Sequence, residues 1–261
     1  MRKFTTLLSK ELGQFFSTPT FYAILAVFIG VSGFFFYNIA RYFANYCMFT
    51  LQYKFQGFNV PLNVNQWVVR PFFINLAVLA LFLIPIITMR SYAAERAYGT
   101  AELLLTAPIK TSQLVLSKLV GGLILFIVLI STTILFQLIL DHYAVGGLDW
   151  GPVWAGYLGL LLIGFATIPL GQFISTLTKN QIIAAFLTFA FMLILWIVDW
   201  STLFSQTKLA KIVGYIGMAP HFNNFAKGVI DTSDVIYFIS AGILGIFLTF
   251  QSVESWRWRG A

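Results

Sequence analysis

The chain has 261 residues, of which 59% are hydrophobic and only 10% charged, against about 25% charged residues in a typical soluble domain. This composition excludes a soluble globular domain. The net charge of +7 at pH 7 is typical of a membrane protein with basic cytoplasmic loops, so we expect no nucleic-acid partner. A single cysteine, Cys47, excludes an intramolecular disulfide, and two histidines give no basis for a metal site.

The apolar runs are long and continuous and do not alternate with period two, so they predict transmembrane helices and not a barrel. We therefore predict an all-α integral membrane protein that forms one transmembrane domain over residues 1–261. Of its lysines and arginines, ten lie on the side of the N-terminus and six on the other side, which places both termini in the cytoplasm. The six predicted spans lie at about 21–39, 72–89, 119–140, 154–176, 181–200 and 235–252.

The segment before the first span, RKFTTLLSKELGQFFSTP, predicts an amphipathic helix that lies along the inner membrane surface. Pro19 is expected to break this helix before the first span enters the bilayer. Lys3, Lys10 and Glu11 lie off its apolar face. That face carries Phe4, Leu7, Leu8, Leu12, Phe15 and Phe16.

Three loops are expected on the outer side, at about 40–71, 141–153 and 201–234. The third loop contains KLAKIVGYIGMAPHFNNFAKGVID, which is amphipathic and interrupted by glycines and Pro220. This pattern predicts short helices at the outer interface or re-entrant into it, since irregular backbone at membrane depth must be covered by protein or water. An ordinary solvated loop is the alternative.

The connection between the second and third spans carries a charged insert, ERAYGTAELLLTAPIKTSQLVLSK, at residues 95–118. Gly99 suits the left-handed position after a helix end, so we expect it to end the helix that descends from the second span. Thr100 is expected to cap a new helix, and Glu102 in the first turn suits the positive end of the helix dipole.

The new helix is expected to be short and apolar on one side. Leucines 103–105 supply that side, and Pro108 disfavours continuation beyond about two turns. Thr111 or Ser112 is expected to cap the helix that leads into the third span. The insert therefore predicts an apolar knob on the cytoplasmic side, suited to being gripped by a soluble partner.

The pattern E-R-x-x-G-T-x-E-L-L-L-T-x-P, from Glu95 to Pro108, resembles the signature between the second and third spans of ABC-2 type transporter permeases. K-E-L at 10–12, six spans with both ends inside, and the outer segment before the last span resemble the same superfamily, particularly its gliding-motility and copper-maturation branch. The first outer loop departs from this pattern, because it is longer and richer in aromatic residues and asparagine than a minimal permease needs.

This resemblance implies a permease half that pairs with a second copy or a paralogue in the lipid bilayer. An ATPase dimer would dock on its cytoplasmic side and bind ATP and magnesium, so that this chain needs no cofactor of its own. The insert resembles the coupling helix that contacts the ATPase, and the N-terminal helix resembles the gate helix, for which we name Lys10, Glu11, Leu12 and Phe15. The coupling residues that match are Glu95, Gly99, Thr100, Glu102, Leu103, Leu104 and Pro108, to which we add Arg96 and Lys110 as polar contacts.

The sequence contains no G-x-x-x-x-G-K-[ST], no H-E-x-x-H and no G-x-S-x-G, so we do not expect this chain to be an enzyme. Charges are scarce inside the predicted spans, and Asp199 lies near an outer end. Because intramembrane ionisable groups normally mark proton and ion paths, this scarcity argues against an ion-coupled secondary transporter.

We therefore expect a multi-pass permease subunit in a bacterial or archaeal cytoplasmic membrane, with export suggested by the resemblance alone. Closure of the ATPase would draw the coupling helices together and open a path lined by the first, second and fifth spans. One alternative is a non-transporting scaffold that passes motion from the ATPase to an outer-side protein partner. A channel that works without ATP is another.

Overall fold

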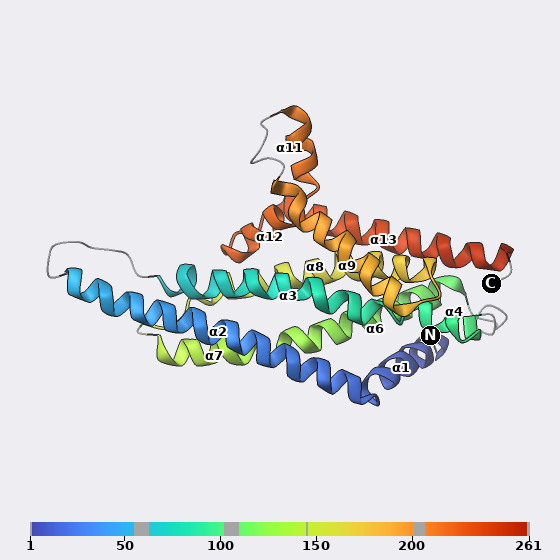
Figure 1. The fold of residues 1–261 in the computed structure, drawn as a ribbon, viewed down its shortest axis with the longest axis horizontal. Helices are drawn as coiled ribbons and strands as arrows, with labels where there is room; N and C mark the ends of the chain where they lie inside the picture. Colours follow the sequence, from blue (N-terminus) through green and yellow to red (C-terminus); the bar gives the residue numbers. More distant parts are fainter. Residues whose placement is uncertain (1, 55–62, 102–109, 145, 201–206, 260–261) are drawn as a thin grey trace.

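The computed structural model describes residues 2–54, 63–101, 110–144, 146–200 and 207–259, and every regular element in this part of the chain is a helix (Figure 1). A shorter apolar helix, Gln181–Ile197, lies where we expect the fifth span, so the six-span count stays a prediction. Within the described ranges, five helices are long and apolar enough to cross a membrane: Pro19–Thr50, Asn65–Ala97, Thr111–Tyr143, Trp150–Leu177 and Thr232–Trp256. The all-α membrane fold class is thereby confirmed.

Both chain ends lie at the same end of the bundle, near α4 (Ala93–Ala97), as an even number of spans requires (Figure 1). Which side of the membrane this end faces stays a prediction, and we call it the inner end. The other elements are α1 (Arg2–Phe16), α2 (Pro19–Lys54), η1 (Asn65–Val69), α3 (Arg70–Thr88), α6 (Thr111–Ser131), α7 (Ile134–Tyr143), α8 (Trp150–Leu177), α9 (Gln181–Ile197), η2 (Val198–Trp200), α11 (Lys208–Tyr215), α12 (Met218–Ala226) and α13 (Thr232–Arg259).

The first outer loop is much shorter than expected. The helix α2 runs for 36 residues to Lys54, and the chain is helical again from Val64. The prediction of a loop over 40–71 was wrong because hydropathy falls after residue 40 while helix-forming tendency does not: residues 40–54 contain neither proline nor glycine. The expected break between α1 and α2 is present, and Pro19 opens α2.

The turn around α4 partly follows the sequence prediction. Gly99 has φ = +71°, so it occupies the left-handed position as expected, although the helix it ends is the short α4 and not a continuation of α3. Thr100 is already helical, and its hydroxyl donates to the carbonyl of Glu95 at 3.3 Å. The cap of α6 was also predicted wrongly, because Lys110 occupies that position and Thr111 donates to Glu254 Oε2 at 2.7 Å.

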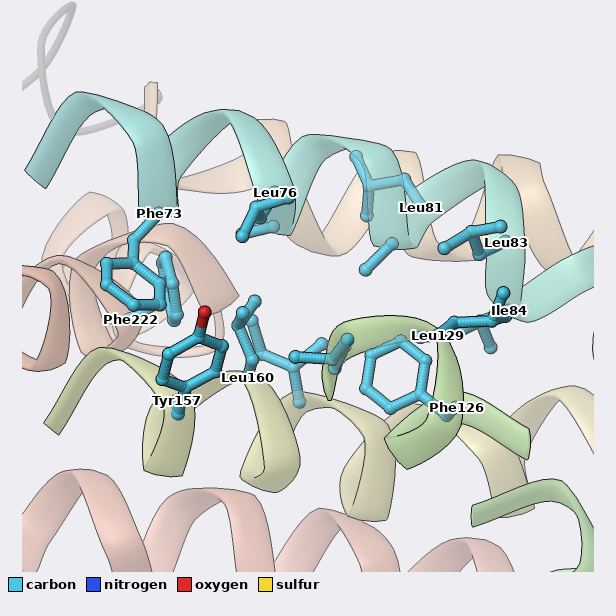
Figure 2. Close-up of a cluster of buried hydrophobic side chains, with 14 of the residues drawn as sticks. Phe73, Leu76, Leu81, Leu83, Ile84, Phe126, Leu129, Tyr157, Leu160 and Phe222 are labelled. Carbon is cyan, nitrogen blue, oxygen red and sulfur yellow. The ribbon is translucent and has the colours of Figure 1, made fainter. Parts of the chain in front are cut away.

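The centre of the bundle is α8, against which α3, α6, α12 and α13 pack (Figure 1). Glycines allow this close contact, since a Cβ at Gly156 would lie 2.7 Å from the Phe73 ring and one at Gly164 would lie 2.5 Å from Phe126. In Figure 2, Phe73 and Tyr157 face each other across the core, with ring centroids 5.0 Å apart. The core is therefore an apolar layer between α3, α6 and α8.

The third outer loop contains two short helices, α11 and α12, where the glycine- and proline-interrupted pattern predicts them. Figure 1 shows α11 projecting from the side of the bundle, while α12 lies against it. Whether either helix enters the membrane interface stays a prediction.

Candidate functional site at the inner end of the bundle

A buried lysine forms the centre of a charged cluster at the inner end. Lys118 lies in the second turn of α6 and is only 3% exposed. Its ammonium Nζ donates to Glu11 Oε1 at 2.7 Å and to Glu95 Oε1 at 2.8 Å. This inner cluster (Glu11, Glu95 and Lys118) joins α1, α4 and α6 through one side chain.

Glu11 reaches the cluster because α1 packs directly on α6. It follows Leu7 by one turn, so both residues lie on the buried face of α1. The two helices are close here, since a Cβ at Gly121 of α6 would be in van der Waals contact with the Cβ of Glu11, at 3.5 Å. The prediction that Glu11 lies off the apolar face of this helix is therefore wrong: its carboxylate is buried because Lys118 compensates its charge.

Glu95 is positioned by hydrogen bonds that hold α4 against the end of α8. The hydroxyl of Ser175 accepts from the backbone N–H groups of Tyr92 and Ala93, at 3.2 and 3.0 Å. Arg96 donates from Nη1 to the carbonyl of Thr176 at 2.7 Å, and its guanidinium lies 5.0 Å from the ring centre of Trp256. Arg96 therefore contacts α8 and α13 within the same chain.

The charges of the inner cluster do not balance, because one ammonium faces two carboxylates. The ring of Tyr92 lies 5.3 Å from Nζ of Lys118 and adds a favourable contact with the cation. Burying a lysine without a counter-charge costs free energy. Here α1 and α4 each supply one carboxylate to Lys118. The arrangement fixes α1 and α4 relative to α6, and offers no nucleophile and base pair for catalysis.

A cavity of about 490 Å³ lies beside the cluster, between α1 and the α3–α4 turn. It brings together predicted gate-helix residues (Lys10, Glu11 and Phe15) and predicted coupling residues (Glu95 and Thr100). The two segments named from the sequence thus meet at one place.

Of the remaining predicted residues, Leu12 is half-buried, while Gly99 and Lys110 are exposed. Glu102, Leu103, Leu104 and Pro108 lie outside the described residues, so their proposed contact with an ATPase stays a prediction. Among the described residues, no group of three or more histidine, cysteine, aspartate or glutamate side chains could hold a metal ion.

A second buried cluster was not predicted. His221 of α12 has both ring nitrogens next to oxygen acceptors, with Nδ1 at 2.6 Å from Asp234 Oδ1 and Nε2 at 2.9 Å from the carbonyl of Tyr215. Asn224 donates to the other carboxylate oxygen of Asp234 at 2.8 Å, and the imidazole stacks on the ring of Tyr237 with centroids 4.1 Å apart. We call His221, Asn224 and Asp234 the outer cluster. The spacing of these residues in the sequence does not predict that they lie together.

The all-helical bundle and its five long apolar helices, within the described ranges, define a multi-pass integral membrane protein. A family model described as ABC-2 family transporter protein matches residues 50–250. The chain therefore belongs to the ABC-2 family and is a multi-pass membrane permease subunit of an ABC transporter, a kind of subunit that lacks ATPase motifs and works with a partner ATPase component. Among curated proteins, no sequence matches this chain.

Proposed function

We propose that this permease subunit belongs to an exporter of a bacterial or archaeal cytoplasmic membrane, driven by a cytoplasmic ATPase dimer through residues 95–118. The observation that supports this most strongly is the inner cluster, because Glu95 and Lys118, at the two ends of this segment, form an ion pair with each other, and Lys118 also pairs with Glu11 of α1. Whatever moves the predicted coupling helix between them would also move α1 through Glu11. The assignment to the gliding-motility and copper-maturation branch rests on sequence resemblance.

In this mechanism, the ATPase drives the permease because two conformations of the permease bind the closed nucleotide dimer with different free energies. ATP and magnesium bind to the ATPase, which this chain contacts through its knob. Separating a buried lysine from its carboxylates costs on the order of 3–5 kcal/mol. The α1 helix and the α4 turn therefore move together with α6, and a second copy or a paralogue completes the path.

A second function is favoured by the shape of the outer side. The long helix α2 and the projecting helix α11 offer surfaces to an outer-side protein partner (Figure 1). In that case the subunit passes motion across the membrane without carrying a solute. ATPase activity measured in reconstituted vesicles distinguishes the two functions. A solute should stimulate the ATPase activity of a transporter, whereas only the outer-side protein partner should stimulate that of a scaffold.

The test of coupling uses the complex purified in mild detergent, with its ATPase identified by mass spectrometry. Replacing Glu102 and Leu103 together with alanine should abolish transport per ATP hydrolysed while leaving the subunit in the membrane. The matched control replaces Lys179, in the inner connection between α8 and α9, and Gln181, the first residue of α9, with alanine and should keep wild-type coupling. Unchanged transport and unchanged ATPase retention in the first variant would contradict the proposal.

A further inference from the structure

Three cavities follow one another along α2 and α3. The polar cavity beside the inner cluster shares Phe15, Thr20 and Arg90 with a second cavity of about 230 Å³. The second shares Ala23, Ile24 and Ile86 with a third of about 340 Å³. Because each cavity shares wall residues with the next, the three adjoin one another from the inner end toward the middle of the bundle, and we call this row of cavities the groove.

The length of the groove matches one leaflet of a bilayer. Its walls extend from Thr20 to Val31 on α2 and from Arg90, two residues past the end of α3, back to Leu79 on α3. At a rise of 1.5 Å per residue, each wall is about 16 Å long. Half of a hydrocarbon core about 30 Å thick is about 15 Å, so the groove is about as long as one leaflet's hydrocarbon layer is thick.

The chemistry of the walls changes along this length. At the inner end, Lys10 and Arg90 face the polar cavity with the inner cluster and several hydroxyls. The two carboxylates there already accept from Lys118, so the five charged side chains carry one net positive charge. Within the described part of the chain, neither Lys10 nor Arg90 forms an ion pair. The third cavity has only apolar walls: Ala23, Ile24, Val27, Phe28, Val31, Leu79, Phe82, Leu83 and Ile86.

We propose that this groove binds one anionic phospholipid of the inner leaflet, with its phosphate at Lys10 and Arg90 and an acyl chain between α2 and α3. A free anion would leave the second and third cavities unused, whereas an acyl chain would fill them. Val27 and Phe82 are 65% and 53% exposed at the open side, so a chain enters laterally from the bilayer. The bound phosphate lies beside the inner cluster, which joins α1 and α4 through Lys118.

The headgroup end is tested by native mass spectrometry of the full chain with phosphatidylglycerol or phosphatidylcholine of equal acyl chains. We expect wild-type protein to retain phosphatidylglycerol preferentially, and Arg90→Gln or Lys10→Gln to weaken that retention about fivefold, the effect of one basic side chain near a membrane surface. Arg41→Gln, at the outer part of α2, is the control and should change nothing. Equal retention of both lipids by wild-type protein would overturn the proposal.

The acyl end is tested with two substitutions on one helix. Ala23 lines the passage between the second and third cavities, whereas Ala26 is exposed on the same helix and lines none of the three. Ala23→Phe should abolish retention of the lipid, and Ala26→Phe should not. Glycerol phosphate that competes as well as the intact lipid would show a free-anion site and refute acyl binding. Neither readout involves transport, so failure here leaves the proposed function intact.

Discussion

The molecule carries a buried charged cluster near each end of α13, and the two are built differently. In the inner cluster, Lys118 is 107 positions from Glu11 and 23 from Glu95, so one side chain joins three separate helices. In the outer cluster, His221 and Asp234 are 13 positions apart and tie α12 to the start of α13. The inner cluster therefore holds the bundle together over long chain distances, while the outer one fixes a local hairpin.

Lys118→Met should break the inner cluster with the largest effect. The substitution leaves two buried carboxylates facing each other without a cation, which costs on the order of 3–5 kcal/mol of unfolding free energy. Denaturant unfolding of the purified chain in mild detergent measures it. Lys179→Met, an exposed lysine near the same end, is the control, and equal stability of the two variants would contradict the assigned role.

His221→Phe should break the outer cluster with a smaller effect. Phenylalanine retains the stacking on Tyr237 but removes both hydrogen bonds of the imidazole, and hydrogen bonds to charged groups contribute about 1.5–3 kcal/mol. The same unfolding experiment measures the loss. The other histidine supplies the control. His142 is exposed, so His142→Phe should leave the free energy of unfolding unchanged.

Glu11→Gln and Glu95→Gln sharpen the comparison, because each leaves Lys118 with one carboxylate. Each single substitution should cost about 0.5–1.5 kcal/mol, since the amide oxygen still accepts from Nζ. The double variant should lose clearly more than the sum, because the ammonium is then buried without a counter-charge. Additive losses would show that the two carboxylates act independently.

Asp231→Asn, at the start of α13, should have the smallest effect. The pKa of Asp231 is lowered by hydrogen bonds from the backbone N–H and hydroxyl of Ser233. A lowered pKa in the folded state means that the ionised group stabilises the protein above its ordinary pKa of 3.8, and that this contribution is lost as the pH falls. The difference in melting temperature between the variant and the wild type should thus become smaller as the pH falls from 6 to about 3. A difference independent of pH would contradict this.

Some features of the fold and of the candidate site can be predicted from the sequence, and others cannot, because each sequence pattern reflects only one physical property. Hydropathy located the long apolar helices but not their ends, because it reports solubility in lipid and α2 continues as a helix beyond its apolar part. The position of Gly99 could be predicted because a single residue's backbone freedom decides it. The pairing of Glu11 with Lys118 could not, since it depends on how α1 rotates against α6, and the bonds of His221 depend on tertiary packing alone.

The length of α2 has a mechanical consequence. Thirty-six residues of helix measure about 54 Å, well beyond the hydrocarbon thickness of about 30 Å. If α2 pivots where it leaves α1, a tilt of about 10° displaces its far tip by about 9 Å. With such a pivot, α2 would act as a lever arm: a small rotation at its base would become a displacement at its far tip larger than the 5.4 Å pitch of one helical turn.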